Sequence, residues 1–165
     1  MNNGFDLAEL ERRANGHSIF APSASAMWLT CAGSLIPNLM AKDTAGRDAA
    51  IGTVAHSVAE EWIRQTGEMP IHLLGTALDI TEGDETFKVE IDKAMLEYVG
   101  EYVAWCEAAP GYHYTESRVD FSRLTPIPNQ GGTADHIAAS PGHLVITDLK
   151  YGTGVQVFAK NNQIG

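Results

Sequence analysis

The sequence predicts an α/β protein in which helices from the first two thirds of the chain pack against a sheet formed by the last third. Two segments, residues 51–65 and 85–108, repeat apolar side chains at three-to-four spacing, as amphipathic helices do. Three later segments, residues 112–121, 133–139 and 144–149, are rich in β-branched and apolar residues, which favour strands.

Length and composition indicate one globular domain. The chain has 165 residues, of which 44% are hydrophobic and 19% charged. No apolar run approaches the roughly 18 residues of a membrane span, and the amino terminus lacks a basic-then-apolar signal. Two cysteines, Cys31 and Cys106, give no disulfide framework. We therefore expect a cytoplasmic protein without membrane contact, made of a helical lead (1–50), a helical part (51–110) and a sheet core (111–165).

The first expected element is a short helix after Pro22. Ser23 is a suitable N-cap, and Trp28 and Leu29 would face inward from the helix that follows. Cys31 ends this segment, and we expect it to be a buried structural cysteine.

The clearest helix is expected over residues 51–65, where the apolar stripe consists of Ile51, Ala55, Val58 and Trp62. His56 and Glu60 stand four positions apart on another face, roughly 130–170° around the helix from that stripe. Two interpretations are open for this pair. It is either a solvated pair that stabilises the helix, or a ligand pair that points into a cleft.

The middle of the chain is expected to be an irregular connection followed by a long helix. Residues 67–84 contain glycines and a proline, which favour loops. Residues 85–108 carry an apolar stripe that predicts one helix: Phe87, Ile91, Met95, Val99, Tyr102 and Cys106. Between Glu68 and Glu107 ten acidic residues and two lysines give a local net charge of −8, against −10 for the whole chain. A face suited to DNA phosphates would therefore have to lie elsewhere.

The last third is expected to contain a hairpin that gathers charged side chains. A Ser-Pro-Gly turn at 140–142 separates its strands. Because side chains alternate along a strand, Asp148 and Lys150 emerge on one face, and Asp135 on the neighbouring strand converges on them. Two carboxylates beside an ammonium suit a hard cation. The alternative is a surface Asp–Lys pair that contributes roughly 0–1 kcal/mol.

Asp135 followed by Asp148-Leu149-Lys150 resembles the PD-(D/E)XK nuclease superfamily in its shortened form, Asp…Asp-X-Lys. His56 and Glu60, after Gly52, are similar to the helix that precedes the core of RecB-like exonucleases, the group that includes phage-borne and CRISPR-associated enzymes.

Four further positions follow the family order. Ser23 and Cys31 are similar to its amino-terminal signature, although Ala32 stands where proline is usual. Glu116 falls where the family often has a glutamate on the strand before the first motif aspartate, and Gln163 where a glutamine follows the lysine strand.

The resemblance implies a restriction-endonuclease-like core, in which helices flank a central mixed sheet, and metal-assisted hydrolysis of phosphodiester bonds in DNA. Its implied metal ligands, for one or two Mg²⁺ or Mn²⁺ ions, are His56, Asp135, Asp148 and the carbonyl of Leu149. Imidazole would bias the site toward Mn²⁺. Some family members hold an iron–sulfur cluster with four cysteines, but no cysteine follows Cys106, so we expect no cluster.

The resemblance also implies roles for the remaining catalytic residues. Lys150 would position the attacking water and offset charge on the phosphate. Glu60 would orient His56. Gln163 would contact DNA or hold Lys150 in place.

Two other functions remain open: a nuclease-fold module that binds DNA or protein without efficient cutting, and a structural or interaction protein of a phage. The helix expected to begin at Asn161 has about one turn before the sequence stops. It would leave uncovered the strand face of Val145 and Leu149, opposite Asp148. We therefore expect either a fragment of a longer phage enzyme, or association with a protein partner or a second copy through the carboxyl-terminal edge.

Overall fold

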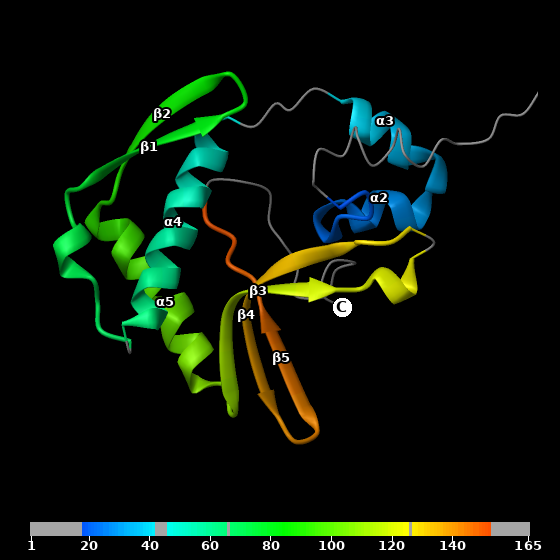
Figure 1. The fold of residues 1–165 in the computed structure, drawn as a ribbon. Helices are drawn as coiled ribbons and strands as arrows, with labels where there is room; N and C mark the ends of the chain where they lie inside the picture. Colours follow the sequence, from blue (N-terminus) through cyan, green and yellow to red (C-terminus); the bar gives the residue numbers. More distant parts are fainter. Residues whose placement is uncertain (1–17, 42–45, 66, 126, 153–165) are drawn as a thin grey trace, which may run out of the picture. The chain divides into compact units, whose positions relative to one another are not determined.

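A computed structural model describes residues 18–41, 46–65, 67–125 and 127–152 (Figure 1). The α/β class is confirmed, since helices and strands are both present. No helix in these four ranges is long and apolar enough to cross a membrane. The described residues divide into two compact units: unit 1, with 18–41, 118–125 and 127–133, and unit 2, with 46–65, 67–117 and 134–152.

Two helices form the core of unit 2. Helix α4 spans Arg47–Arg64 and helix α5 spans Lys93–Ala108. Asp92 is the N-cap of α5, since its carboxylate accepts a hydrogen bond from the Met95 amide at 2.8 Å. The buried side chains of α4 are Ala50, Val54, Ala55, Val58, Ala59 and Trp62. Those of α5 are Met95, Leu96, Val99, Val103 and Cys106. The expected helix from residue 51 is therefore confirmed, with a start one turn earlier.

Strands replace the first part of the expected helix over residues 85–108. Strand β1, Ala77–Glu82, pairs antiparallel with β2, Glu85–Glu90, and Gly83 has the positive φ of 60° that the tight connection needs. The irregular connection expected over 67–84 is therefore wrong from residue 77 onward, and the helix expected over 85–108 begins only at Lys93. The part of the chain expected to be helical, 51–110, thus also contains a hairpin. Phe87 and Ile91 are four apart, a spacing that fits two strand repeats as well as one helical turn.

The expected hairpin is confirmed in the second sheet. Strand β4, Gly131–Ser140, pairs antiparallel with β5, His143–Thr147, and His136 lies opposite Thr147. Strand β3, Tyr112–Asp120, lies on the other side of β4. The strands of the described chain thus form a two-stranded and a three-stranded sheet, where one central mixed sheet was expected.

The exposed apolar positions of the hairpin are not the expected ones. Leu149 is 7% exposed and belongs to the core cluster of α4 and α5, and Val145 is half-buried. Leu144 and Ile146 are exposed instead, at 66% and 43%. The chain bends into the core after β5, so residue 149 is buried. The helix expected to begin at Asn161, which would carry Gln163, lies outside the described residues.

Unit 1 is held by a buried glutamine. The Gln130 side chain is 4% exposed, and its Oε1 accepts hydrogen bonds from the Phe20 amide (3.1 Å) and the Ser18 hydroxyl (2.9 Å). Two short helices, α2 (Ser25–Thr30) and α3 (Leu35–Met40), belong to this unit.

Three expectations for unit 1 are wrong. Ser23 lies inside a 3₁₀ turn, and Ala24 stands at the N-cap of α2, without a side-chain capping bond. Leu29 is 59% exposed, although Trp28 donates inward to the Ala21 carbonyl. Cys31 is exposed, whereas Cys106 is buried.

Two glycines give a test of the α4–α5 contact. A Cβ at Gly100 would lie 2.8 Å from the buried indole of Trp62, whereas one at Gly52 would meet only the Tyr151 carbonyl oxygen, at 3.7 Å. Gly52→Ala should stabilise the protein by about 0.5–1 kcal/mol through helix propensity. Gly100→Ala should destabilise it by about 1 kcal/mol, because overpacking outweighs the same gain. Urea unfolding of both variants measures the difference, and equal stabilities would contradict this packing.

Candidate metal centre

Three side chains from three elements of unit 2 converge on one point. His56 comes from α4, Glu116 from β3 and Asp135 from β4, and their ligand atoms lie within 4.8 Å of one another. His56 Nδ1 is 3.5 Å from Asp135 Oδ2 and 4.0 Å from Glu116 Oε1. Two ligands bound at about 2.1 Å from one ion can be no more than about 4.2 Å apart. Both His56 distances therefore fit ligands of a single ion.

Asp135 is held in position by the backbone of the neighbouring segment. Its Oδ2 accepts a hydrogen bond of 2.7 Å from the Leu149 amide. The Leu149 side chain is buried in the α4–α5 core, so this amide has a fixed position. The carboxylate is thereby oriented toward His56 before any cation binds.

Glu116 reaches the site through an irregular backbone. Its φ is +47°, a value that few non-glycine residues adopt. Around it the regular alternation of exposed and buried residues is lost, since Thr115, Glu116 and Ser117 are all half-buried. Such a conformation costs on the order of 1–3 kcal/mol and is concentrated at functional sites.

A small cavity lies at the convergence point. Its volume is about 10 Å³, and Tyr102 and Leu149 line it together with the three ligands and Glu60. That volume holds roughly one water molecule or one bare ion. Burial, followed by nearby Cys106, raises the pKa of the Tyr102 hydroxyl far above its usual range, so the phenol stays protonated and can donate a hydrogen bond.

The two carboxyl groups of the cluster resist ionisation. Burial, and then repulsion from Asp135, raise the pKa of Glu116 above its ordinary 4.5. Burial also raises the pKa of Asp135, although the Leu149 amide and His56 act in the opposite direction. A cation in the cavity would neutralise both carboxylates. One nitrogen and two oxygen donors suit Mn²⁺, so the residues present fit a divalent ion.

The other sequence-predicted residues lie close by but outside this trio. Lys150 Nζ is 2.7 Å from Asp148 Oδ2, and neither residue lines the small cavity. Both are near enough to affect the pKa of Asp135. Leu149 contributes its amide to Asp135, whereas its carbonyl was the expected ligand. Glu60 lines the cavity, but its carboxylate pairs with Arg64 at 2.6 Å and not with His56.

Sequence reasoning placed Glu116 in the family order without selecting it as a ligand. The chain carries a sign of its role, since a glutamate stands among β-forming residues in a strand that precedes Asp135. The positive φ that turns it toward His56 has no signature in the residue types around it. Tyr102 was expected on the packing stripe of its helix, and its hydroxyl reaches the cavity wall from there. Gln163 lies outside the described residues.

The Glu116→Gln variant tests two effects of this carboxylate: its cost to stability without metal, and its contribution to metal binding. A carboxyl whose pKa is raised on folding contributes stability at low pH that is lost as the pH rises through the raised pKa. Above the raised pKa, metal-free Glu116→Gln should therefore be more stable than wild type by about 0.5–1 kcal/mol, a value discounted for partial exposure. That difference corresponds to about 1–4 °C in Tm.

In excess Mn²⁺ the order should reverse. A ligand at about 100 times its Kd stabilises the wild type by about 2.7 kcal/mol, and the glutamine variant should lose most of that gain. Calorimetric scans with EDTA and with Mn²⁺ test both halves. If Mn²⁺ stabilises the two proteins equally, Glu116 is not a ligand.

A comparison with protein families finds that the model of a family described as "Protein of unknown function (DUF2800)" matches residues 17–164, which is most of the chain. No solved structure matches the chain.

Proposed function

The chain belongs to the family described as "Protein of unknown function (DUF2800)", and from the residues of its candidate site we propose that it is a divalent-metal-dependent nuclease that hydrolyses phosphodiester bonds in DNA. The observation that carries the proposal is the cluster of His56, Glu116 and Asp135, with Asp148 and Lys150 beside it. A core with no catalytic task rarely retains partly buried carboxylates that repel each other. The order of these residues along the chain is also that of the RecB-like nucleases.

Each residue has a role in this proposal. The ion would be held by His56, Glu116 and Asp135. When bound, it would act as a Lewis acid and would lower the pKa of a bound water. Lys150 would offset the charge that develops on the phosphate, and would leave its pair with Asp148 to do so. Asp148 keeps the ammonium at the edge of the site until a phosphate arrives.

The acidic residues are unevenly distributed along the sequence. Ten of the acidic residues lie between Glu68 and Glu107, whereas acidic and basic residues balance after residue 108. Glu116, Asp135 and Lys150 all belong to the balanced part. A bound divalent ion would add two positive charges there. We propose that the enzyme acts in the cytoplasm of a bacterium or of a phage-infected host.

A second candidate is a nuclease-fold module that binds without cutting efficiently. Two observations favour it. The Lys150 ammonium is already paired with the Asp148 carboxylate and is not free to meet a phosphate, and Asp148 does not line the cavity of the cluster. Cleavage rates decide between the candidates.

The decisive measurement is degradation of linear and circular DNA with Mn²⁺, Mg²⁺ or EDTA. Wild-type protein should degrade DNA fastest with Mn²⁺, because an imidazole ligand favours that ion, and not at all with EDTA. Asp135→Asn should reduce degradation to background. Asp79→Asn is a matched control, since it changes an exposed carboxylate on β1. A wild-type protein without metal-dependent cleavage would support the binding module instead.

Lys150→Ala should separate chemistry from metal binding. The cleavage rate should fall by about 10²–10³-fold, the loss typical of removing one group that stabilises charge in a transition state. Calorimetry should still detect Mn²⁺ binding, and binding no weaker than in wild type, because the lysine is not a ligand and its positive charge opposes a cation near Asp135. A variant that retains the wild-type rate would remove Lys150 from the mechanism.

A further inference from the structure

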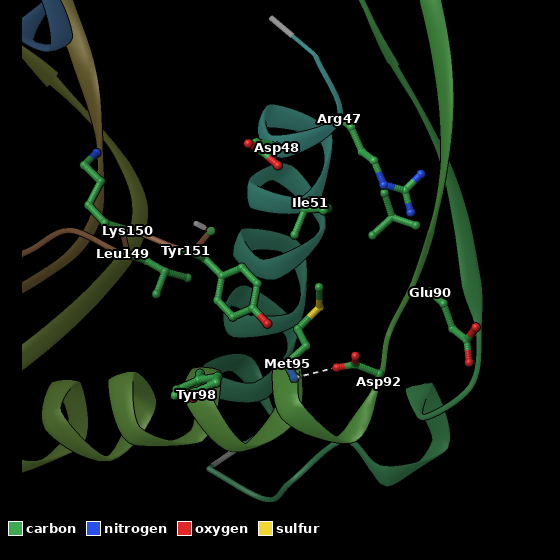
Figure 2. A pocket seen from close by; sticks show the side chains of 12 residues that line it. Arg47, Asp48, Ile51, Glu90, Asp92, Met95, Tyr98, Leu149, Lys150 and Tyr151 are labelled. Carbon is green, nitrogen blue, oxygen red and sulfur yellow. Dashed lines mark hydrogen bonds between the residues drawn. The ribbon is translucent and has the colours of Figure 1, made fainter. Parts of the chain in front are cut away.

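A larger pocket is lined in part by residues 149–152, the segment after β5. Its volume is about 730 Å³, within the range of small-molecule sites, and Figure 2 shows the residues around it. Strand β2 and the segment after β5 form opposite walls, and helices α4 and α5 contribute the rest. Leu149 lines both this pocket and the small metal cavity, so the two spaces are neighbours.

Aromatic and apolar side chains make up much of this pocket. Tyr98 and Tyr151 meet edge to face, with ring centroids 6.4 Å apart, beside Ile51 and Met95 (Figure 2). Tyr98 is 62% exposed. An edge-to-face pair leaves ring faces free, so an incoming planar group can stack on this pair.

The charges of the pocket select the kind of planar group. Asp48, Glu90 and Asp92 contribute three carboxylates, against the cations of Arg47 and Lys150. A phosphate backbone running through this pocket would meet net negative charge. A nucleobase is uncharged, and its exocyclic amino groups donate hydrogen bonds that carboxylates accept. The Arg47 guanidinium can form an ion pair with the phosphate attached to that base.

We propose that this pocket, defined by Tyr98, Tyr151 and Arg47, receives an unpaired nucleobase of the DNA strand whose phosphate enters the neighbouring metal centre. The inference rests on the proposed nuclease function and specifies its substrate. Bases inside a duplex are stacked and paired and cannot enter such a pocket without extrusion. The enzyme therefore acts on single strands and on frayed ends.

Binding measured without cleavage tests the pocket independently of catalysis. The probe is a fluorescein-labelled single strand about ten nucleotides long, read by anisotropy with Ca²⁺ in place of Mn²⁺ and recovered intact on a gel. A hairpin duplex of the same composition is the comparison. Wild-type protein should bind the single strand more tightly than the duplex.

Three variants on helix α5 give matched controls. Tyr98→Ala should weaken single-strand binding by about 5- to 150-fold, the loss of one base-stacking side chain. Tyr98→Phe keeps the ring and should bind like wild type. Trp105→Ala removes an aromatic residue of the same helix that is 69% exposed and does not line the pocket, and should also bind like wild type.

The outcomes separate this inference from the proposed function. If Tyr98→Ala binds like Trp105→Ala, or if duplex binds as well as single strand, the base pocket is overturned even where Mn²⁺-dependent cleavage is present. Tyr98-dependent binding of the single strand without any cleavage in Mn²⁺ would support the pocket and overturn the nuclease. If instead a short oligolysine peptide binds in a Tyr98-dependent way and the strand does not, the carboxylates serve a cationic partner and the inference is wrong.

Discussion

The hydrogen bond from the Leu149 amide to Asp135 is the contact on which the rest of the site depends. It joins strand β4 to the segment after β5 at 2.7 Å, and it fixes the carboxylate that His56 approaches from α4. The same residue inserts its side chain into the core between α4 and α5. Core packing therefore determines where the metal ligands stand, and a change in that packing would move Asp135 against His56. Leu149 also lines both the small cavity and the larger pocket.

The sequence correctly predicted the elements whose apolar spacing fits either a helix or a strand but not both. Helix α4 has a stripe repeated over several turns, and the hairpin of β4 and β5 is bounded by a Ser-Pro-Gly turn. The hairpin of β1 and β2 was missed, because Phe87 and Ile91 satisfy both the helical and the strand repeat. The Glu-Gly-Asp-Glu sequence at 82–85 was the local signal that favoured strands.

The site was predictable to the extent that it follows from alternation along regular elements. His56 and Asp135 come together as expected, since a helix face and a strand face each have a defined direction. Asp148 and Lys150 emerge side by side for the same reason, and they form an ion pair. The two errors of emphasis have different causes. Glu116 enters the site through a positive φ, which residue spacing does not encode. Glu60 pairs with Arg64 four positions later on the same helix, and this spacing favours that pair as much as the one with His56.

Two independent costs meet at Glu116, and their coincidence is the strongest physical argument for function at this site. The residue adopts a left-handed backbone conformation within a strand, and its carboxyl group is placed where burial and Asp135 both disfavour its charge. A regular strand with a neutral side chain at this position would avoid both costs. Nothing in the packing of the α4–α5 core requires Glu116, because it does not belong to the core cluster. A cation bound by His56 and Asp135 would attract the Glu116 carboxylate and so remove its electrostatic cost. The irregular backbone would then serve to bring this carboxylate to the cation. A metal ion at this site would thus explain both the irregular backbone of Glu116 and the unfavourable position of its charge.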